Sequence, residues 1–277
     1  MNEIETIKHR IDVAMEREEA DIVFTNGKVI STFTEEIIET EVAVSKGKIV
    51  ALGYNGKAKE IIDLKGSYLS PSFIDSHIHI ESSMLSVENF AKTVISHGTG
   101  TIISDPHEIV NVNGINAFEY IVNSASNIKG IDILFNVPSC VPATDIENSG
   151  AKLTSKDIES IFQKYPNIPG LSEMMNYPGV YFKAPQVIEK IYTAHKFNKI
   201  IDGHSPLVKG KELNAYICAG ITTDHECTNA QEAKEKLQKG MYILIREGSA
   251  AQNLKNLCPV ITDKTAHRIC IATDDRE

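Results

Sequence analysis

The chain has 277 residues, of which 42% are apolar and 23% charged, the composition of an ordinary globular protein with one large domain or two. Its formal net charge of -9 argues against a broad nucleic-acid surface, which needs a basic patch, and favours a small-molecule or protein partner. The sequence contains no apolar run long enough to cross a membrane and no signal peptide, because the N-terminal segment is charged throughout.

The first 70 residues predict a helix followed by a small β domain. Apolar residues recur at helical spacing from Ile4 to Ala14, so residues 3–19 of the N-terminal segment 1–20 predict an amphipathic helix that packs on the domain behind it. Short β runs flank Asn26-Gly27 and Lys46-Gly47, and each pair of runs predicts a hairpin. We therefore expect a small antiparallel β domain over residues 21–70.

After Pro71 the pattern changes to alternating strands and helices. The predicted strands are 73–79, 101–104, 131–137, 170–175, 199–202, 221–223, 241–246 and 268–273, and the predicted helices are 87–97, 115–126, 155–165, 185–197, 211–219, 229–239 and 250–257. Residues 105–114 read as a loop. This alternation predicts an α/β fold, a (β/α)₈ TIM-type barrel over residues 71–277 whose final helix is missing. A doubly wound sheet is the rival architecture.

Polar side chains follow the predicted strands at their carboxyl ends, where (β/α)₈ barrels place their active sites. His77 and His79 point to one face of the first strand because side chains alternate with period two, and two neutral imidazoles on one face can bind a transition metal. Alone, such a pair is more often an ordinary polar strand end. Further acids and histidines at or just after the later strand ends favour the interpretation as a metal site. They are Asp105, His107, Glu108, Glu173, His204, His225 and Asp274.

Several stretches of the sequence resemble the amidohydrolase superfamily, whose members place a metal-dependent hydrolase barrel beside a small β-sandwich. The N-terminal stretches DIVFTNGKVI, KGKIVALG and IIDLKGSYLSPSFIDSHIH carry this resemblance. Within the superfamily the chain is more similar to the adenine deaminase family, through the stretches HIHIESSML, DPHEIVNV, GLSEMMNYPGV, DGHSPLV, AGITTDHE, IREGSA and TDDR.

The resemblance implies roles for six residues and two metal ions per chain. His77 and His79 would bind the more buried ion, and His204 and His225 the second. Glu173 would bridge the two ions, where many relatives use a carboxylated lysine. Asp274 would bind metal and transfer the proton of the attacking water, and Asp275 is the alternative if the strand register differs by one residue. Mn(II) or Fe(II) is implied, and Zn(II) also suits such ligands.

A second group of polar residues lies near these positions without an assigned role. Glu81, Ser82 and Ser83 follow the first strand and can contact the purine or support the histidines, although the serines fit helix capping equally well. Asp105, His107 and Glu108 can bind substrate, relay protons or bind a further ion. Glu247 either caps a helix or faces the substrate.

The implied reaction is hydrolytic deamination of adenine to hypoxanthine and ammonia, in a cytoplasmic homo-oligomer with neither nucleic acid nor membrane as partner. The five cysteines include no C-x-x-C pair, which fits reduced thiols. Two alternatives remain open: an amidohydrolase acting on a cyclic amide or an N-acyl amino acid, and an inactive subunit with an assembly role.

Two features depart from the family pattern. Ser72 stands where relatives commonly have glycine, which is a mild change. The resemblance also implies a chain about twice this length, with further elements after the eighth strand, so we expect the chain to be a fragment, a truncated product or a protein completed by a partner.

Overall fold

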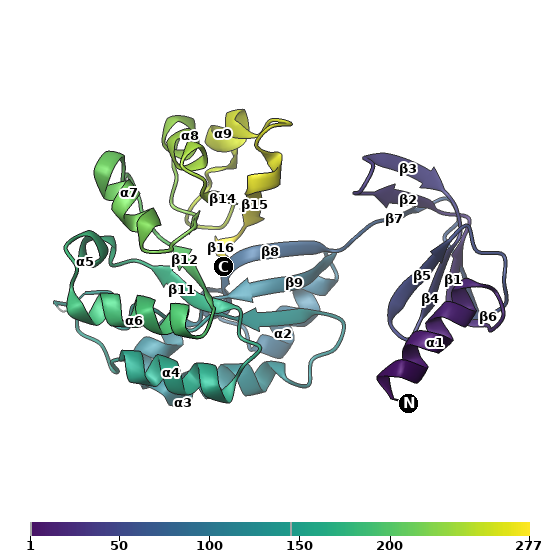
Figure 1. Cartoon of the computed structure of the whole chain (residues 1–277), viewed down its shortest axis with the longest axis horizontal. Helices are drawn as coiled ribbons and strands as arrows, with labels where there is room; N and C mark the ends of the chain where they lie inside the picture. The colour runs from purple at the N-terminus through teal and green to yellow at the C-terminus, as the bar shows by residue number, and fades with distance from the viewer. Residues whose placement is uncertain (1, 145) are drawn as a thin grey trace. The chain divides into compact units, whose positions relative to one another are not determined.

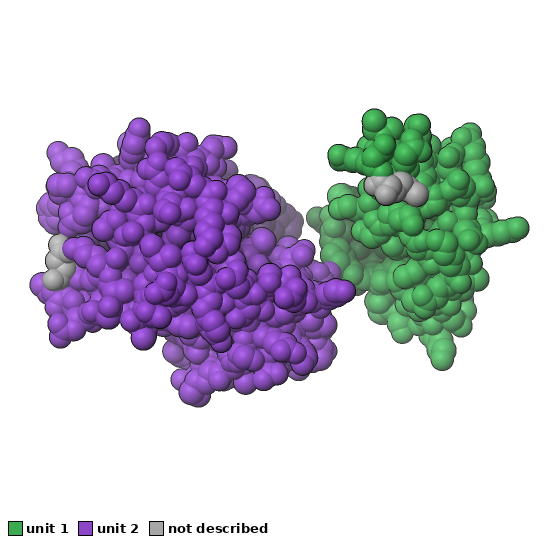
Figure 2. Space-filling view, turned by 90° about the horizontal axis from the view of Figure 1, so that it is seen from below, with its two compact units in different colours: residues 1–71 green, residues 72–277 purple. Residues whose placement is uncertain are grey.

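A computed structural model describes residues 2–144 and 146–277, and the chain divides into two compact units. Unit 1 comprises Met1–Pro71 and unit 2 comprises Ser72–Glu277 (Figure 2). Among the described residues, no helix is both long enough and apolar enough to span a bilayer.

Unit 1 contains one helix and two small sheets within its described residues (Figure 1). Its elements are α1 (Glu3–Ala14), β1 (Ala20–Thr25), β2 (Lys28–Ser31), β3 (Glu36–Glu39), β4 (Val42–Ser45), β5 (Lys48–Leu52), β6 (Ala58–Asp63) and β7 (Tyr68–Leu69). One sheet has the strand order β5-β4-β1-β6 and the other the order β3-β2-β7.

The hairpin predicted at Asn26-Gly27 is wrong, because β1 and β2 belong to different sheets. Both edges of β1 are already paired, with β4 antiparallel and with β6 parallel. The Asn26-Gly27 turn therefore carries the chain from one sheet to the other, and β6 and β7 make the same passage alongside it. The sheets are mixed rather than purely antiparallel.

The hairpin predicted at Lys46-Gly47 is confirmed, since β4 and β5 pair antiparallel. Helix α1 also forms, and the Asn2 side chain caps it by accepting a hydrogen bond from the Glu5 amide. Only Val13 of α1 enters the core of unit 1, while Ile4, Ile7 and Ile11 stay exposed. The helix therefore packs on unit 1 as expected, but it does so through Val13 and not through the isoleucine face that carried the helical spacing.

Unit 2 alternates strands and helices along its length. Its strands are β8 (Phe73–His79), β9 (Thr99–Ser104), β10 (Asp132–Phe135), β11 (Gly170–Met174), β12 (Ile200–Gly203), β13 (Thr223–Asp224), β14 (Tyr242–Arg246), β15 (Ile269–Ala272) and β16 (Asp274–Asp275). Its α-helices are α2 (Val87–Ile95), α3 (His107–Ala125), α4 (Ser155–Lys164), α5 (Tyr177–Tyr181), α6 (Pro185–Lys196), α7 (Gly210–Cys218), α8 (Ala230–Gln238) and α9 (Leu254–Leu257), with single 3₁₀ turns η1 (Ile80–Ser83), η2 (Cys258–Val260) and η3 (Ala266–Arg268).

The strands of unit 2 follow one another around a circuit in chain order. Parallel pairing joins β8 to β9 and β9 to β10, and a bridge between Val137 and Leu171 leads on to β11. Strand β11 pairs with β12, and the Gly203 amide of β12 donates to the Thr223 hydroxyl of β13 at 2.8 Å. Strands β13, β14 and β15 pair in turn, and β16 pairs with β8. The α/β class is confirmed, and a doubly wound sheet is excluded because the last strand pairs with the first.

The helices of unit 2 lie outside the strands and bury apolar faces against them (Figure 1). The core includes Phe118 of α3, Phe162 of α4 and Leu213 of α7. The loop predicted over residues 105–114 is wrong in part, because α3 already begins at His107. The helix is interrupted only at Asn113 and Gly114, where Gly114 has a φ of 58°.

Candidate metal centre

Strand β8 presents two buried imidazoles to the inside of the circuit. The Nε2 atoms of His77 and His79 lie 3.2 Å apart. The Nδ1 of His79 donates to the Asp105 carbonyl at 2.8 Å, and the Nδ1 of His77 lies 3.1 Å from the Asp202 carboxylate. Because a carbonyl only accepts, neutral His79 carries its proton on Nδ1 and turns the Nε2 lone pair inward.

Asp274 of β16 completes this first group of donor atoms. Its Oδ1 lies 3.1 Å from the Nε2 of His79 and 3.5 Å from that of His77. Its backbone is left-handed, with a φ of 60°, a conformation that aspartate tolerates better than most residues. The neighbouring Asp275 carboxylate instead accepts from the Ser82 hydroxyl at 2.5 Å. Asp274 is therefore the acid that lies in the cluster.

Glu173 of β11 stands between this group and a second one. Its Oε1 lies 3.5 Å from the Nε2 of His79 and 3.9 Å from that of His77. Its Oε2 lies 2.6 Å from the Nδ1 of His204 and 3.1 Å from the Nε2 of His225. One carboxylate thus faces two pairs of imidazoles with different oxygens, the placement that a bridging ligand needs.

Hydrogen bonds fix the positions of the loops that carry His204 and His225. The His204 amide donates to the Tyr216 hydroxyl, which donates in turn to the Met174 carbonyl next to Glu173. On the other side, the Asp224 carboxylate accepts from the amide and the hydroxyl of Ser205 at 2.7 and 2.8 Å. Both histidine positions are therefore fixed by hydrogen bonds from helix α7 and between the loop after β12 and the end of β13.

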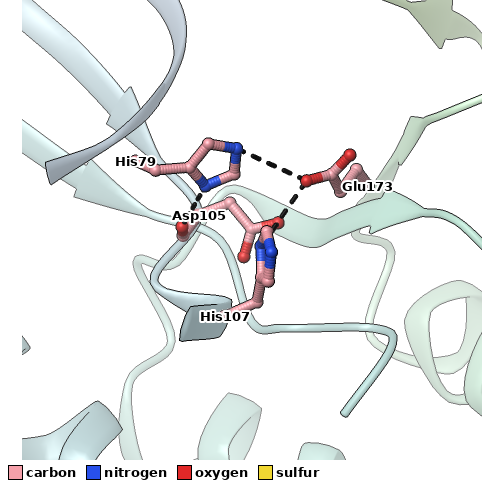
Figure 3. A group of neighbouring side chains, drawn as sticks. All are labelled: His79, Asp105, His107 and Glu173. Atoms are coloured by element: carbon pink, nitrogen blue, oxygen red, sulfur yellow. Dashed lines mark hydrogen bonds and ion pairs between the residues drawn. The ribbon is translucent and has the colours of Figure 1, made fainter. Parts of the chain in front are cut away.

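The end of β9 brings a further acid and imidazole to the first group (Figure 3). Asp105 is 1% exposed, and neither of its carboxylate oxygens accepts a well-aligned hydrogen bond from the residues that the structure describes. The Nδ1 of His107 lies 3.2 Å from Asp105 and 3.5 Å from the Oε1 of Glu173. A buried carboxylate without hydrogen bonds is costly unless a cation balances it.

The electrostatics of the cluster favour cations. Burial lowers the pKa of His77, but Asp202, Asp274 and Glu173 outweigh burial and raise it well above its ordinary value. Burial also opposes the shift at His79, whose pKa still rises to about 10. At Glu173 burial raises the pKa, and the surrounding imidazoles lower it well below its ordinary value. The acids therefore stay charged, and protons or metal ions must balance them.

These donors suit divalent transition metals. Neutral imidazole and carboxylate are the ligands that Zn(II), Mn(II) and Fe(II) accept. Donor atoms close enough to share an ion come from His77, His79 and Asp274 in one group and from His77, Glu173 and His225 in another. The Oε2 of Glu173 also lies 2.6 Å from the Nδ1 of His204. Bare Nε2 lone pairs 3.2 Å apart repel each other, and a shared cation removes that repulsion. The residues present therefore fit metal ions.

The other residues expected near the site have mixed placements. One oxygen of Glu81 accepts a hydrogen bond from the Ile109 amide, and the other has no hydrogen-bond partner among the described residues. Burial, and after it the negative charge of the nearby Glu108, raises the pKa of Glu81 to about 7. Ser83 bonds within its own turn. Glu247 is exposed and accepts from the Leu254 amide at the start of α9, away from the cluster.

Sequence reasoning missed several residues that contact the ligands. Arg246 at the end of β14 donates to Asp274 at 2.7 Å and forms an ion pair with Glu226. The Asp202 carboxylate lies 3.1 Å from the Nδ1 of His77. The Lys236 ammonium of α8 donates to Asp224, the residue before His225. A signal existed for Asp202, which precedes His204 by two residues and so shares its side of the strand. Glu226 follows His225 directly.

Comparison with known proteins places these observations in a family. The model of the amidohydrolase family matches residues 68–272. An adenine deaminase of Dehalococcoides mccartyi is 49% identical over 266 residues, covering 96% of this chain and 46% of that protein. One of Clostridium acetobutylicum is 46% identical over 271 residues, covering 98% and 47%. The chain thus spans about half the length of the curated relatives it matches.

Solved structures show the same fold at low sequence identity. The dihydropyrimidinase of Brevibacillus agri superimposes with a TM-score of 0.64 at 14% identity, over 91% of this chain and 68% of that one. At this identity the likeness concerns the fold alone.

Proposed function

The chain belongs to the amidohydrolase family, and on that premise we propose that its cluster binds two divalent metal ions and hydrolyses adenine to hypoxanthine and ammonia. Two sets of facts support the proposal: relatives 46–49% identical over nearly the whole chain are adenine deaminases, and Glu173 lies between two pairs of imidazoles. The placement of Glu173 is the single observation that carries the proposal, because one carboxylate lies with its two oxygens toward two different pairs of imidazoles.

Each residue would bind one or both of the metal ions according to its position. His77 and His79 would hold one ion, His204 and His225 the other, and Glu173 would bridge them. Bound divalent ions supply Lewis acidity that makes hydroxide available from water near neutral pH. We prefer Mn(II) or Fe(II) over Zn(II), as the family resemblance implies.

Asp274 would act as the proton carrier. One of its oxygens faces the histidines and the other is held by Arg246, so the carboxylate has a fixed orientation. When water oxygen adds to C6 of adenine, Asp274 takes the water proton and returns it to the ring nitrogen or to the departing amine. The C6–N bond then breaks, and ammonia and hypoxanthine leave.

The same premise extends to the rest of the chain. We infer that unit 2 is the metal-dependent hydrolase barrel and that residues 21–70 form a β-sandwich-like accessory domain. All five cysteines are free thiols, which supports a cytoplasmic location.

The test is release of ammonia from adenine by the purified chain, kept anaerobic and loaded with Mn(II) or Fe(II). We expect ammonia and hypoxanthine in equal amounts, and no turnover of hydantoin, dihydroorotate or N-acyl amino acids. Turnover of one of those substrates but not of adenine, by chain that holds two ions, would move the assignment to another amidohydrolase reaction.

A further inference from the structure

Glu226 lies beside His204 and His225, the two histidines proposed to bind the second ion, where a further ligand of that ion would fit. Its Oε1 lies 3.6 Å from the Nδ1 of His204 and 3.6 Å from the Nε2 of His225. Glu173 Oε2 lies 2.6 and 3.1 Å from the same two nitrogens. Two imidazole nitrogens are therefore flanked by one carboxylate oxygen of Glu173 on β11 and one of Glu226 in the loop after β13.

These separations, from 2.6 to 3.6 Å, lie close to those of atoms that share one metal ion. Ligand atoms about 2.1 Å from an ion lie about 3.0 to 3.4 Å apart in octahedral or tetrahedral geometry. His204, His225 and Glu226 offer donor atoms that all lie within 4.8 Å of one another. Small adjustments of the two carboxylates would bring all four atoms to a common ion.

Arg246 fixes Glu226 in this position. Its guanidinium donates to both oxygens of Glu226, at 2.5 and 3.0 Å, and to the Oδ2 of Asp274 at 2.7 Å. Arg246 is 8% exposed, so water screens these contacts little. Asp274 gives Arg246 one oxygen and turns the other toward His77 and His79. Glu226 gives Arg246 both oxygens, and its Oε1 also faces His204 and His225 because a carboxylate oxygen has more than one lone pair.

We propose that Glu226 is a fourth side-chain ligand of the metal ion held by His204 and His225, and that Arg246 is a positioning residue that links this ligand to Asp274 at the other ion. The inference rests on the proposed function for its two-ion site. It adds a carboxylate ligand to one ion, and it links the ligands of the two ions through the hydrogen bonds of Arg246 to Glu226 and Asp274. An ion bound by Glu173, His204, His225 and Glu226 would keep a full set of protein donors when substrate or water comes and goes.

The experiment is a titration of the metal-free full chain with Mn(II), followed by equilibrium dialysis and plasma mass spectrometry. For Glu226→Gln we expect the first equivalent to bind as in the parent and the second to bind about 10- to 100-fold more weakly or not at all, at least the loss seen for outer partners of metal ligands. Glu226→Asp, which keeps the charge, should restore part of the affinity. The matched control is Glu88→Gln, at an exposed glutamate that forms an ion pair with Lys92 on α2.

Co(II) in place of Mn(II) separates ligation from a merely structural role. Loss of a ligand changes the visible spectrum of bound Co(II), whereas loss of a distant contact leaves it unchanged. Arg246→Gln should weaken the same equivalent, because Glu226 is then untethered. The double variant Glu226→Gln/Arg246→Met removes the ion pair as a unit; recovery of the second equivalent in that protein would mean that Glu226 only neutralises Arg246.

The proposal is overturned if folded Glu226→Gln binds both equivalents with parental affinity and an unchanged Co(II) spectrum, or if the parent binds no second ion. A parent that binds two ions but leaves adenine unchanged would instead contradict the proposed function, and the titration would still decide the role of Glu226.

Discussion

Unit 2 contains two clusters of buried charge that differ in how their atoms are satisfied. Around Lys236, which is fully buried, the ammonium donates to the Ser205 carbonyl, Asp224 and Glu232 at 2.7 to 2.8 Å. Both oxygens of Asp224 accept hydrogen bonds. Around Glu173, by contrast, the Nε2 atoms of His77 and His79 face each other, and the Asp105 carboxylate accepts no well-aligned hydrogen bond from the described residues, although the Nδ1 of His107 lies 3.2 Å away.

The difference separates a structural cluster from a functional one. The Lys236 ammonium binds acceptors in the loop after β12, at the end of β13 and on α8, and one oxygen of Glu232 is left without a hydrogen bond among the described residues. The Glu173 cluster holds more donor and acceptor atoms than it can pair, and it depends on something from outside the chain. Substitutions in the Lys236 cluster should therefore lower the free energy of unfolding, whereas substitutions in the Glu173 cluster should weaken metal binding and lower the reaction rate.

The largest expected effect is the loss of activity in Glu173→Gln. The amide keeps the size of the side chain but removes the charge that would bridge the ions. We expect the rate of ammonia release from adenine to fall by about 10⁴-fold or more, beyond the range of a single acid–base group. Circular dichroism should show an unchanged fold. A variant with the full parental rate would remove Glu173 from the bridging role.

Asp274→Asn should lower the rate almost as much while metal binding survives better. Asparagine retains an oxygen for the ion but cannot accept the proton of water. We expect kcat to fall by about 10² to 10⁴-fold, with ion content close to that of the parent. If Asp274→Asn deaminates adenine at the parental rate, proton transfer belongs to another group such as Glu108.

Lys236→Met should act on stability. It leaves Asp224 and Glu232 in the interior without their cation, at a cost of about 3 to 5 kcal/mol in the free energy of unfolding. Urea unfolding of the metal-free chain measures the effect, and Lys236→Met/Asp224→Asn should recover part of it. Lys196→Met, at an exposed ion pair with Glu159, is the control. Equal loss in both single variants would show that burial of Lys236 does not matter.

The smallest effect is a pH dependence confined to the metal-free chain. Burial opposes the shifts, but the neighbouring acids raise the pKa of His79 to about 10 and that of His107 to about 9, above the unfolded value of about 6.5. The folded chain then holds extra protons, and its stability falls as pH rises from about 6.5 toward 10. Bound Mn(II) would replace those protons, so the melting temperature of the loaded chain should fall less. Identical slopes would argue against a cluster that accepts metal.

The sequence predicted that these acids and histidines cluster because their positions follow local rules. Strand β8 was predicted with the bounds that the structure has, and period-two alternation placed His77 and His79 on one side. Strand–helix alternation then predicted that acids and histidines at later strand ends share that side. These inferences need only the nearest residues in the chain.

What the sequence left open depends on contacts between distant segments. The Asn26-Gly27 turn has a hairpin sequence, but β1 pairs with β4 and β6, and local propensity does not select those partners. The choice between Asp274 and Asp275 depends on the left-handed backbone of Asp274 and on its pairing with β8. Glu226 and Arg246 acquire roles only because β13, β14 and β16 bring them together.

The central claim is that Glu173 joins two ions in one site, and a metal count tests it most directly. The parent chain and Glu173→Gln are dialysed together against Mn(II), and bound metal per folded chain is measured by plasma mass spectrometry. The account predicts about two ions in the parent and at most one in the variant. A folded parent that retains no ion, or a variant that retains two, would contradict it.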